Sequence, residues 1–183
     1  MKKIIIVSLL CYSVVAFAQT KENNIVTKGY HGTASVGGGY CFTEYSGFVS
    51  LQTVHGYQFN PYIFVGGGAG LELSDIGRRG TQPVYMPVFA DGRFNAVVNK
   101  CAPFIELKLG YSIPLYSPTK PSVYGGLYFS PSIGVLFEIT EKYSAGIAVE
   151  YSLINGHSNL FSWSGEFSPQ VHHLVGGRLF FGF

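Results

Sequence analysis

Charged residues are scarce in this sequence. They make up 12% of its 183 residues, whereas about 25% is usual for a soluble domain. Aromatic residues are abundant by comparison, at 16%, and 24 residues are glycine. This imbalance indicates that much of the protein surface faces something other than water.

The sequence also lacks an apolar run that could form a transmembrane helix after residue 18. Such a helix needs roughly 20 consecutive apolar residues, and every apolar run downstream of residue 18 is interrupted well before that length. Backbone groups inside hydrocarbon must be hydrogen-bonded within the structure, which leaves the closed β-barrel as the other architecture that can span a membrane.

The first 18 residues match a cleavable secretory signal peptide. Lys2 and Lys3 precede an apolar stretch over residues 4–17, and Ala16-Phe17-Ala18 has the small-x-small form of a cleavage site. We therefore expect cleavage before Gln19, with a retained membrane helix as the alternative. The chain that remains has ten basic and ten acidic residues, and no basic patch points to nucleic acid as a partner.

Alternating apolar and polar side chains predict eight strands in the rest of the chain. Short turns, such as the one at Asn60-Pro61, alternate with longer loops, of which residues 155–169 form the longest. This pattern is typical of membrane barrels. The predicted strands cover residues 30–40, 47–59, 62–73, 84–95, 103–112, 126–139, 144–154 and 170–183.

The predicted fold class is all-β, an eight-stranded antiparallel up-and-down transmembrane β-barrel with an N-terminal cleavable signal peptide. Residues 1–18 are assigned to the signal peptide, 19–29 to an N-terminal lead and 30–183 to the barrel. An even number of strands puts both chain termini on the periplasmic side.

The charged residues of the predicted strands share one face, because successive side chains of a strand point to opposite sides. An eight-stranded barrel is just wide enough for side chains to fill it, so we predict a plug of paired charges and no wide aqueous pore. The alternative is a lipocalin-like soluble barrel or a secreted β-sandwich with the faces reversed, but the charges are too few to cover its outside. The predicted inward set is Glu72, Asp91, Arg93, Glu106, Lys108, Glu138, Glu150 and Arg178.

Three stretches of the chain carry a family resemblance. They are residues 56–62 leading into Val65-Gly66-Gly67-Gly68, the segment Met86-Pro87-Val88-Phe89, and the aromatic carboxy-terminus. In these stretches the chain resembles the small outer-membrane β-barrel proteins of the OmpA/OmpX type, especially the outer-membrane β-barrel domain family common in Bacteroidetes. The resemblance covers essentially the whole chain after the leader.

The resemblance implies a place in the outer membrane of a Gram-negative type envelope, in contact with outer-membrane lipid and lipopolysaccharide. It also implies that the last strand is read by the barrel-assembly machinery during biogenesis. The residues that would form this assembly signal are Gly177, Leu179, Phe181 and Phe183.

Cys41 and Cys101 raise the question of a disulfide, which is common in exported proteins. The predicted strands place the two residues at opposite ends of the barrel, roughly 30 Å apart, whereas bridged Cα atoms lie within about 7 Å. We therefore predict two reduced thiols.

Three further motifs suggest chemistry that the sequence supports poorly. His157-Ser158-Asn159, with Glu166 downstream, resembles the His-x-Ser-Asn motif of lipid A deacylases, but it lacks the intervening residue and falls in a predicted loop. The pair His172-His173 cannot place both rings on one side of a strand to bind a metal. The glycines at 66–68 have no third phosphate-loop glycine, because Leu71 stands there. We assign no catalytic residue, metal or cofactor.

The loop over residues 160–167 is the best candidate for recognition, because exposed apolar side chains usually contact something. Phe161, Trp163 and Phe167 are its candidate residues, although aromatic side chains here could also be anchors at the headgroup level. The favoured function is non-enzymatic: an integral outer-membrane β-barrel with a structural or surface-interaction role through its extracellular loops. The alternatives are a narrow transporter of small solutes and a lipid A modifying hydrolase. The sequence does not identify an extracellular partner.

Overall fold

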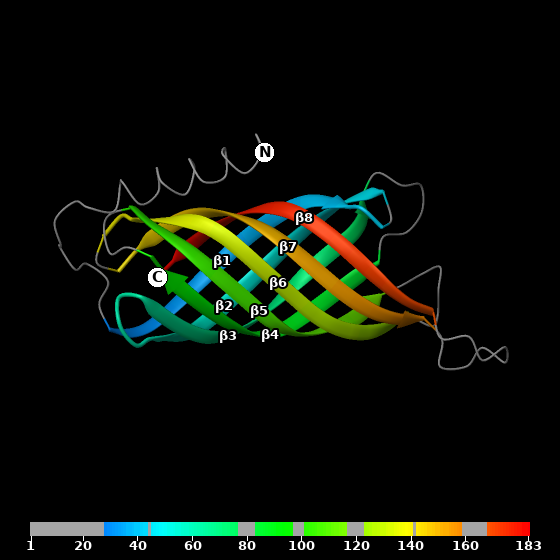
Figure 1. Cartoon of the computed structure of the whole chain (residues 1–183), viewed down its shortest axis with the longest axis horizontal. Coiled ribbons are helices and arrows are strands. Elements are labelled where there is room, and N and C mark those ends of the chain that lie inside the picture. Colours follow the sequence, from blue (N-terminus) through cyan, green and yellow to red (C-terminus); the bar gives the residue numbers. More distant parts are fainter. Residues whose placement is uncertain are drawn as a thin grey trace, which may run out of the picture.

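The computed structural model describes residues 28–43, 45–76, 83–96, 101–116, 123–140, 142–158 and 168–183, and within these ranges the chain forms eight strands (Figure 1). Each strand pairs in antiparallel fashion with the next, and β1 pairs with β8 to close the barrel. The fold class predicted from the alternation is confirmed, while the predicted signal peptide lies outside the described residues. The strands are β1 (Gly29–Cys41), β2 (Ser46–Gln58), β3 (Ile63–Ile76), β4 (Val84–Asn95), β5 (Cys101–Tyr116), β6 (Val123–Glu138), β7 (Ser144–Ser158) and β8 (Ser168–Gly182).

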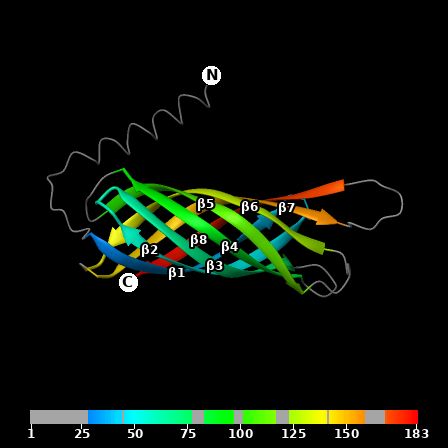
Figure 2. The same cartoon turned by 90° about the horizontal axis from the view of Figure 1, so that it is seen from below.

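The strands incline strongly to the long axis of the barrel, as Figures 1 and 2 show from two sides. The short turns after β2 and β6 lie at the same end as the start of β1 and the end of β8, and we call this the short-turn end. Asn60 stabilises the first of these turns, because its side-chain oxygen accepts hydrogen bonds from the backbone N–H groups of Tyr62 and Ile63 at 2.9 and 2.8 Å.

The largest differences from the predicted bounds, four residues each, lie at the ends of β5 and β7. The predicted strand 103–112 stops before Pro114, but β5 continues to Tyr116. The β5–β6 ladder ends where Ser112 pairs with Gly126, and among the described residues Pro114 pairs only with Tyr85 of β4. A proline costs a strand little stability at a locally unpaired edge, because no carbonyl of a neighbouring strand there would accept a hydrogen bond from the N–H that proline lacks.

The second difference concerns residues 155–158, which were predicted to begin a long loop. In the structure the β7–β8 ladder continues through the pairs His157 with Pro169 and Ser158 with Ser168. The prediction that the His157-Ser158 motif lies in a loop is therefore wrong, because the backbone pairing of this hairpin runs beyond the alternating segment.

Phenylalanine rings and glycines fit together in the interior. A Cβ atom added to Gly134 would lie 2.7 Å from Cζ of Phe104, and one added to Gly68 would lie 2.8 Å from Cε2 of Phe89. Such distances leave no room for a side chain, so each glycine allows a ring to cover the neighbouring strand.

The buried apolar side chains of the described interior form two clusters. Phe104, Leu136 and Phe180 belong to the cluster nearer the short-turn end, while Phe89 and Tyr128 belong to the other. Along β5, Glu106 and Lys108 follow Phe104, so the charged side chains are enclosed between apolar groups.

Cys41 is buried and Cys101 is exposed, and no disulfide joins them. The prediction for this pair is confirmed, because the end of β1 and the start of β5 lie at opposite ends of an up-and-down barrel.

Candidate functional site

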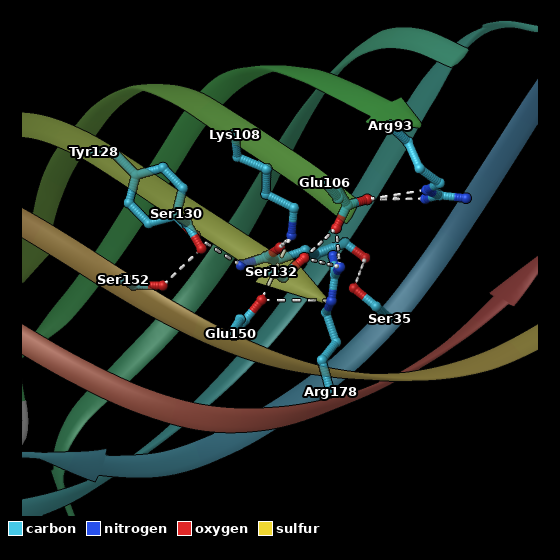
Figure 3. A network of polar contacts seen from close by, with 11 residues as sticks. Ser35, Arg93, Glu106, Lys108, Tyr128, Ser130, Ser132, Glu150, Ser152 and Arg178 are labelled. Carbon is cyan, nitrogen blue, oxygen red and sulfur yellow. Dashed lines mark hydrogen bonds and ion pairs between the residues drawn. The ribbon is translucent and has the colours of Figure 1, made fainter. Parts of the chain in front are cut away.

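A row of polar side chains crosses the interior from β4 to β7. The backbone register pairs Arg93 with Glu106, Glu106 with Ser132 and Ser132 with Glu150. Because paired residues on neighbouring strands point to the same side of the sheet, these four side chains meet inside the barrel, and Arg178 reaches them from β8 (Figure 3).

Glu106 lies at the centre of this network. Arg93 donates two hydrogen bonds to its Oε1 atom, from Nη2 at 2.9 Å and from Nε at 3.3 Å. Ser132 donates to Oε2 at 3.0 Å, and Arg178 donates to the same oxygen through Nη2. The carboxylate is fully buried, so these charge-assisted bonds offset the loss of its hydration.

Glu150 and Lys108 extend the network across the lumen. Oε2 of Glu150 lies 3.4 Å from Nε of Arg178 and 3.7 Å from Nζ of Lys108. Lys108 also donates to the side-chain oxygen of Gln52 on β2, whose amide nitrogen donates to the hydroxyl of Tyr128 at 3.3 Å. Polar contacts therefore connect β2 with β5, β6, β7 and β8.

Aromatic rings surround the cations. The guanidinium carbon of Arg93 lies 5.2–5.3 Å from the ring centres of Phe64, Phe104 and Phe180, and Nζ of Lys108 lies 5.2 Å from that of Phe89. Cation–π attraction of this kind strengthens when water is excluded, so the rings both close the lumen and stabilise its positive charges.

Asp91 differs from the other buried carboxylates. Its backbone pairs with that of Lys108, yet neither carboxylate oxygen has a hydrogen-bond partner among the described residues, and the residue is only 2% exposed. Glu72 accepts one long bond, from the Ser74 hydroxyl at 3.4 Å. A buried carboxylate without hydrogen bonds opposes folding, so the lumen contains well-compensated and poorly compensated charges side by side.

The outer face of the barrel is apolar. On β5 the outward residues Ile105, Leu107 and Leu109 are 44–58% exposed, whereas the inward Glu106 and Lys108 are at most 3% exposed. This orientation rules out the soluble barrel or sandwich with apolar residues inside. No helix in the described part of the chain is long and apolar enough to cross a membrane.

Aromatic pairs lie on the outer face near the short-turn end. Tyr62 stacks on Phe94 with ring centres 6.5 Å apart, and Tyr143 stacks on Phe181 at 5.7 Å. Tyr40 and Phe42 contact each other at the opposite end of the barrel. Aromatic belts above and below an apolar band are characteristic of barrels that cross a bilayer.

Several solved structures are similar to this one. Neisserial surface protein A superposes with a TM-score of 0.60 at 13% identity, over 84% of this chain and 94% of that one. The outer membrane protein OprG from Pseudomonas aeruginosa gives a TM-score of 0.59 at 12% identity, over 87% and 98% of the two chains. The N-terminal β-barrel domain of Pseudomonas aeruginosa OprF gives 0.53 at 9% identity, over 86% and 100%.

The fold is that of the outer-membrane β-barrels. No protein-family model matches the sequence, and no curated protein matches it. The identities to the solved structures are low, so the likeness concerns the fold alone. The apolar outer face suits hydrocarbon independently of these comparisons, because closed antiparallel barrels with such a face span outer membranes.

Seven of the eight residues predicted to face the lumen are buried, at 7% exposure or less. Glu138, the eighth, is half-buried at the short-turn end of β6. It lines a small cavity of about 50 Å³ together with Gln58, Asn95 and Lys142, with Arg93 also in its wall. Glu138 is thus part of the lumen mouth and not of the network around Glu106.

The other sequence candidates are distributed as follows. Leu179, Phe181 and Phe183 alternate on the outer face at 44–59% exposure, and Gly177, which pairs with Val149 of β7, is also exposed. The loop candidates Phe161, Trp163 and Phe167 lie outside the described residues, as do Glu166 and the side chains of the His157-Ser158 motif. In the described ranges, no group of three or more metal-binding side chains is present.

The sequence prediction missed the uncharged members of the network. Gln52, Ser132 and Tyr128 all lie on inward positions of their strands, at the same alternation as the charged residues. That alternation could have identified them, but polar residues without charge are also common at turns and outer rims, so charge alone was the stronger signal.

Proposed function

We propose that the protein is a non-enzymatic integral barrel of the outer membrane, with the short-turn end facing the periplasm. Its role is structural in the envelope or consists of presenting extracellular loops to a surface partner. The observation that carries this proposal is the closed lumen, in which Lys108, Tyr128 and Glu106 are essentially unexposed and connected from wall to wall.

A lumen filled in this way offers no continuous path for water or hydrated ions. Purified protein in planar bilayers is therefore expected to show no stable unitary conductance above the lipid background. Reproducible conductance steps that disappear when the protein is heat-denatured before addition would instead support the transport alternative.

The structural and loop-presenting roles make different predictions for one variant, in which residues 160–166 are replaced by a Gly-Ser-Gly turn. In a strain that lacks the native gene, a structural barrel restores resistance to detergent with or without these residues. A loop-presenting barrel inserts normally but fails to restore surface binding. Heat-dependent gel mobility of both forms confirms that the barrel has folded before either result is interpreted.

The finer relationship, to the OmpA/OmpX type and to the barrel-domain family common in Bacteroidetes, belongs to the same proposal. The eight-stranded up-and-down topology and the sequence stretches around residues 56–68 support it. We also propose that outer-membrane lipid and lipopolysaccharide surround the barrel, and that the outward residues of β8, including Phe181 and Phe183, contact the barrel-assembly machinery during insertion.

A further inference from the structure

A hollow crosses the outer face of the barrel at an angle to the strands. Its volume is about 670 Å³, within the range of about 300–1,000 Å³ that is usual for small-molecule sites. Residues of six consecutive strands line it, from β3 to β8, and they include Val65, Gly92, Leu107, Pro131, Tyr151 and Val175.

The backbone register explains why the surface is hollow here. Val65 pairs with Gly92, Gly92 with Leu107, and Leu107 with Pro131, so these residues form one row across the sheet. Gly92 contributes no side chain, and a Cβ atom placed on it would meet no atom within 4 Å. Pro131 contributes only its compact ring, so two shallow positions lie in the same row.

The neighbouring row forms a raised bank beside the hollow. Phe94, Ile105 and Ile133 stand on its outer face at 47%, 58% and 63% exposure, and the register pairs Phe94 with Ile105 and Ile105 with Ile133. The hollow is thus a groove with a wall of apolar side chains along this side.

The dimensions of the groove match one leaflet of a bilayer. Five strand intervals of about 4.8 Å give a length of roughly 24 Å. Because the strands tilt by about 40° from the barrel axis, this row climbs by roughly 15 Å along the membrane normal. That height is half of a hydrocarbon core about 30 Å thick. On β3 the lining of the groove includes Ile63, the first residue of that strand, so the groove opens in the leaflet on the short-turn side.

We infer that this groove holds one acyl chain of a phospholipid from the periplasmic leaflet. The inference rests on the proposed membrane location and orientation. The groove is continuous with the apolar band that faces hydrocarbon, so a hydrocarbon chain is the group that reaches it. The acyl chain prefers the groove to the rest of the outer face because a concave wall gives each methylene more dispersion contacts than a flat one. Hydrophobicity alone gives no such preference, because lipid tails and leucine side chains are equally apolar.

The test uses photo-crosslinking in vesicles of phosphatidylethanolamine and phosphatidylglycerol that contain a small fraction of phospholipid with a diazirine in the middle of one acyl chain. After irradiation, mass spectrometry of peptides locates the label. We expect labelling of residues 92–94 of β4 and 131–133 of β6, which line the groove, to exceed labelling of the outer faces of β1 and β2 by about fivefold. This ratio corresponds to a difference in binding free energy of about 1 kcal/mol.

Two variants add the same side chain at different places on the outer face. Gly92→Leu fills the groove, and we expect it to reduce the enrichment to the level of the other strands. Ala34→Leu places a leucine on the exposed outer face of β1, away from the groove, and we expect it to leave the enrichment unchanged.

Uniform labelling around the wild-type barrel, or undiminished enrichment in Gly92→Leu, would overturn the inference. Heat-dependent gel mobility of each protein, recovered from the same vesicles, separates this failure from a failure of the proposed function. A wild-type chain that shows no such mobility shift and does not remain with the vesicles would contradict the membrane location itself.

Discussion

At the scale of single residues, Glu106 is the point at which the lumen charges converge. It accepts hydrogen bonds from Arg93, Arg178 and Ser132, and its side chain has no exposure to solvent. Two buried guanidinium groups therefore share this carboxylate as a counter-charge. Arg178 has Glu150 as a second partner, whereas the ion pairs of Arg93 in the described residues involve Glu106 alone.

Glu106→Gln tests this convergence without changing the shape of the side chain. We expect it to lower the free energy of unfolding by about 3–5 kcal/mol, because one partner of a buried ion pair is removed and cations are left uncompensated. Urea unfolding in lipid vesicles, followed by gel mobility, measures the change. A loss below about 1 kcal/mol would mean that the network contributes little.

Asp91→Asn provides the matched comparison on the neighbouring strand. Asp91 is as deeply buried as Glu106, but its oxygens have no hydrogen-bond partner in the described part of the chain. Removing its charge should therefore change the free energy of unfolding by no more than about 1 kcal/mol in either direction. The same urea titration measures it, and a loss as large as that of Glu106→Gln would show that Asp91 has a compensating partner.

At the scale of strands, large interior rings pack against glycines of the neighbouring strands. The barrel interior can hold these rings only because the glycines have no side chain. Gly134→Ala would place a Cβ atom 2.7 Å from Cζ of Phe104 and 2.9 Å from Cα of Ala148. We expect a destabilisation of about 1–3 kcal/mol from this overpacking. Gly92→Ala, on the open outer face, should be close to neutral in the same unfolding assay, and equal effects of the two substitutions would contradict this explanation.

The alternation of side chains was enough to predict most strands, and it failed where proline or a hairpin extension was involved. The strand from Val84 to Asn95 was predicted with the observed bounds, because a proline and a polar turn flank a clearly alternating segment. The predicted strand ended at Ser112, before a proline-rich loop, but β5 continues through Pro114, which is paired on one edge only. Whether an edge is paired depends on the neighbouring strand, and a local pattern does not contain that information.

The candidate site shows the same limit. Alternation assigns Glu106 and Arg178 to the inner face, but they are 72 positions apart and meet only because of the stagger between strands around the barrel. The sequence predicts which face a charge occupies and not the height at which it meets a partner. For that reason it did not distinguish Asp91, whose carboxylate has no hydrogen-bond partner among the described residues, from Glu106, whose carboxylate accepts four hydrogen bonds.

At the scale of the whole molecule, the two cysteines of the barrel, Cys41 and Cys101, report on orientation across the membrane. Cys101 is exposed at the short-turn end, whereas Cys41 is 3% exposed at the other end. A membrane-impermeant thiol reagent should leave this protein unlabelled in intact cells. It should label Cys101 once the outer membrane is disrupted so that the reagent enters the periplasm, and it should label both cysteines only after the protein is unfolded. Peptide mass spectrometry measures each site, and labelling of Cys101 in intact cells would reverse the proposed orientation.

The pairing of β1 with β8 brings the first and last strands of the barrel together. Until β8 docks, β1 and β7 each present an edge of unsatisfied backbone groups, and Glu106 and Glu150 lack the guanidinium that β8 delivers. A partly assembled sheet therefore carries unpaired amides and exposed anions into hydrocarbon, where both are strongly unfavourable. Insertion and closure should consequently occur as one concerted event, with Arg178 neutralising the interior at the moment the cylinder seals.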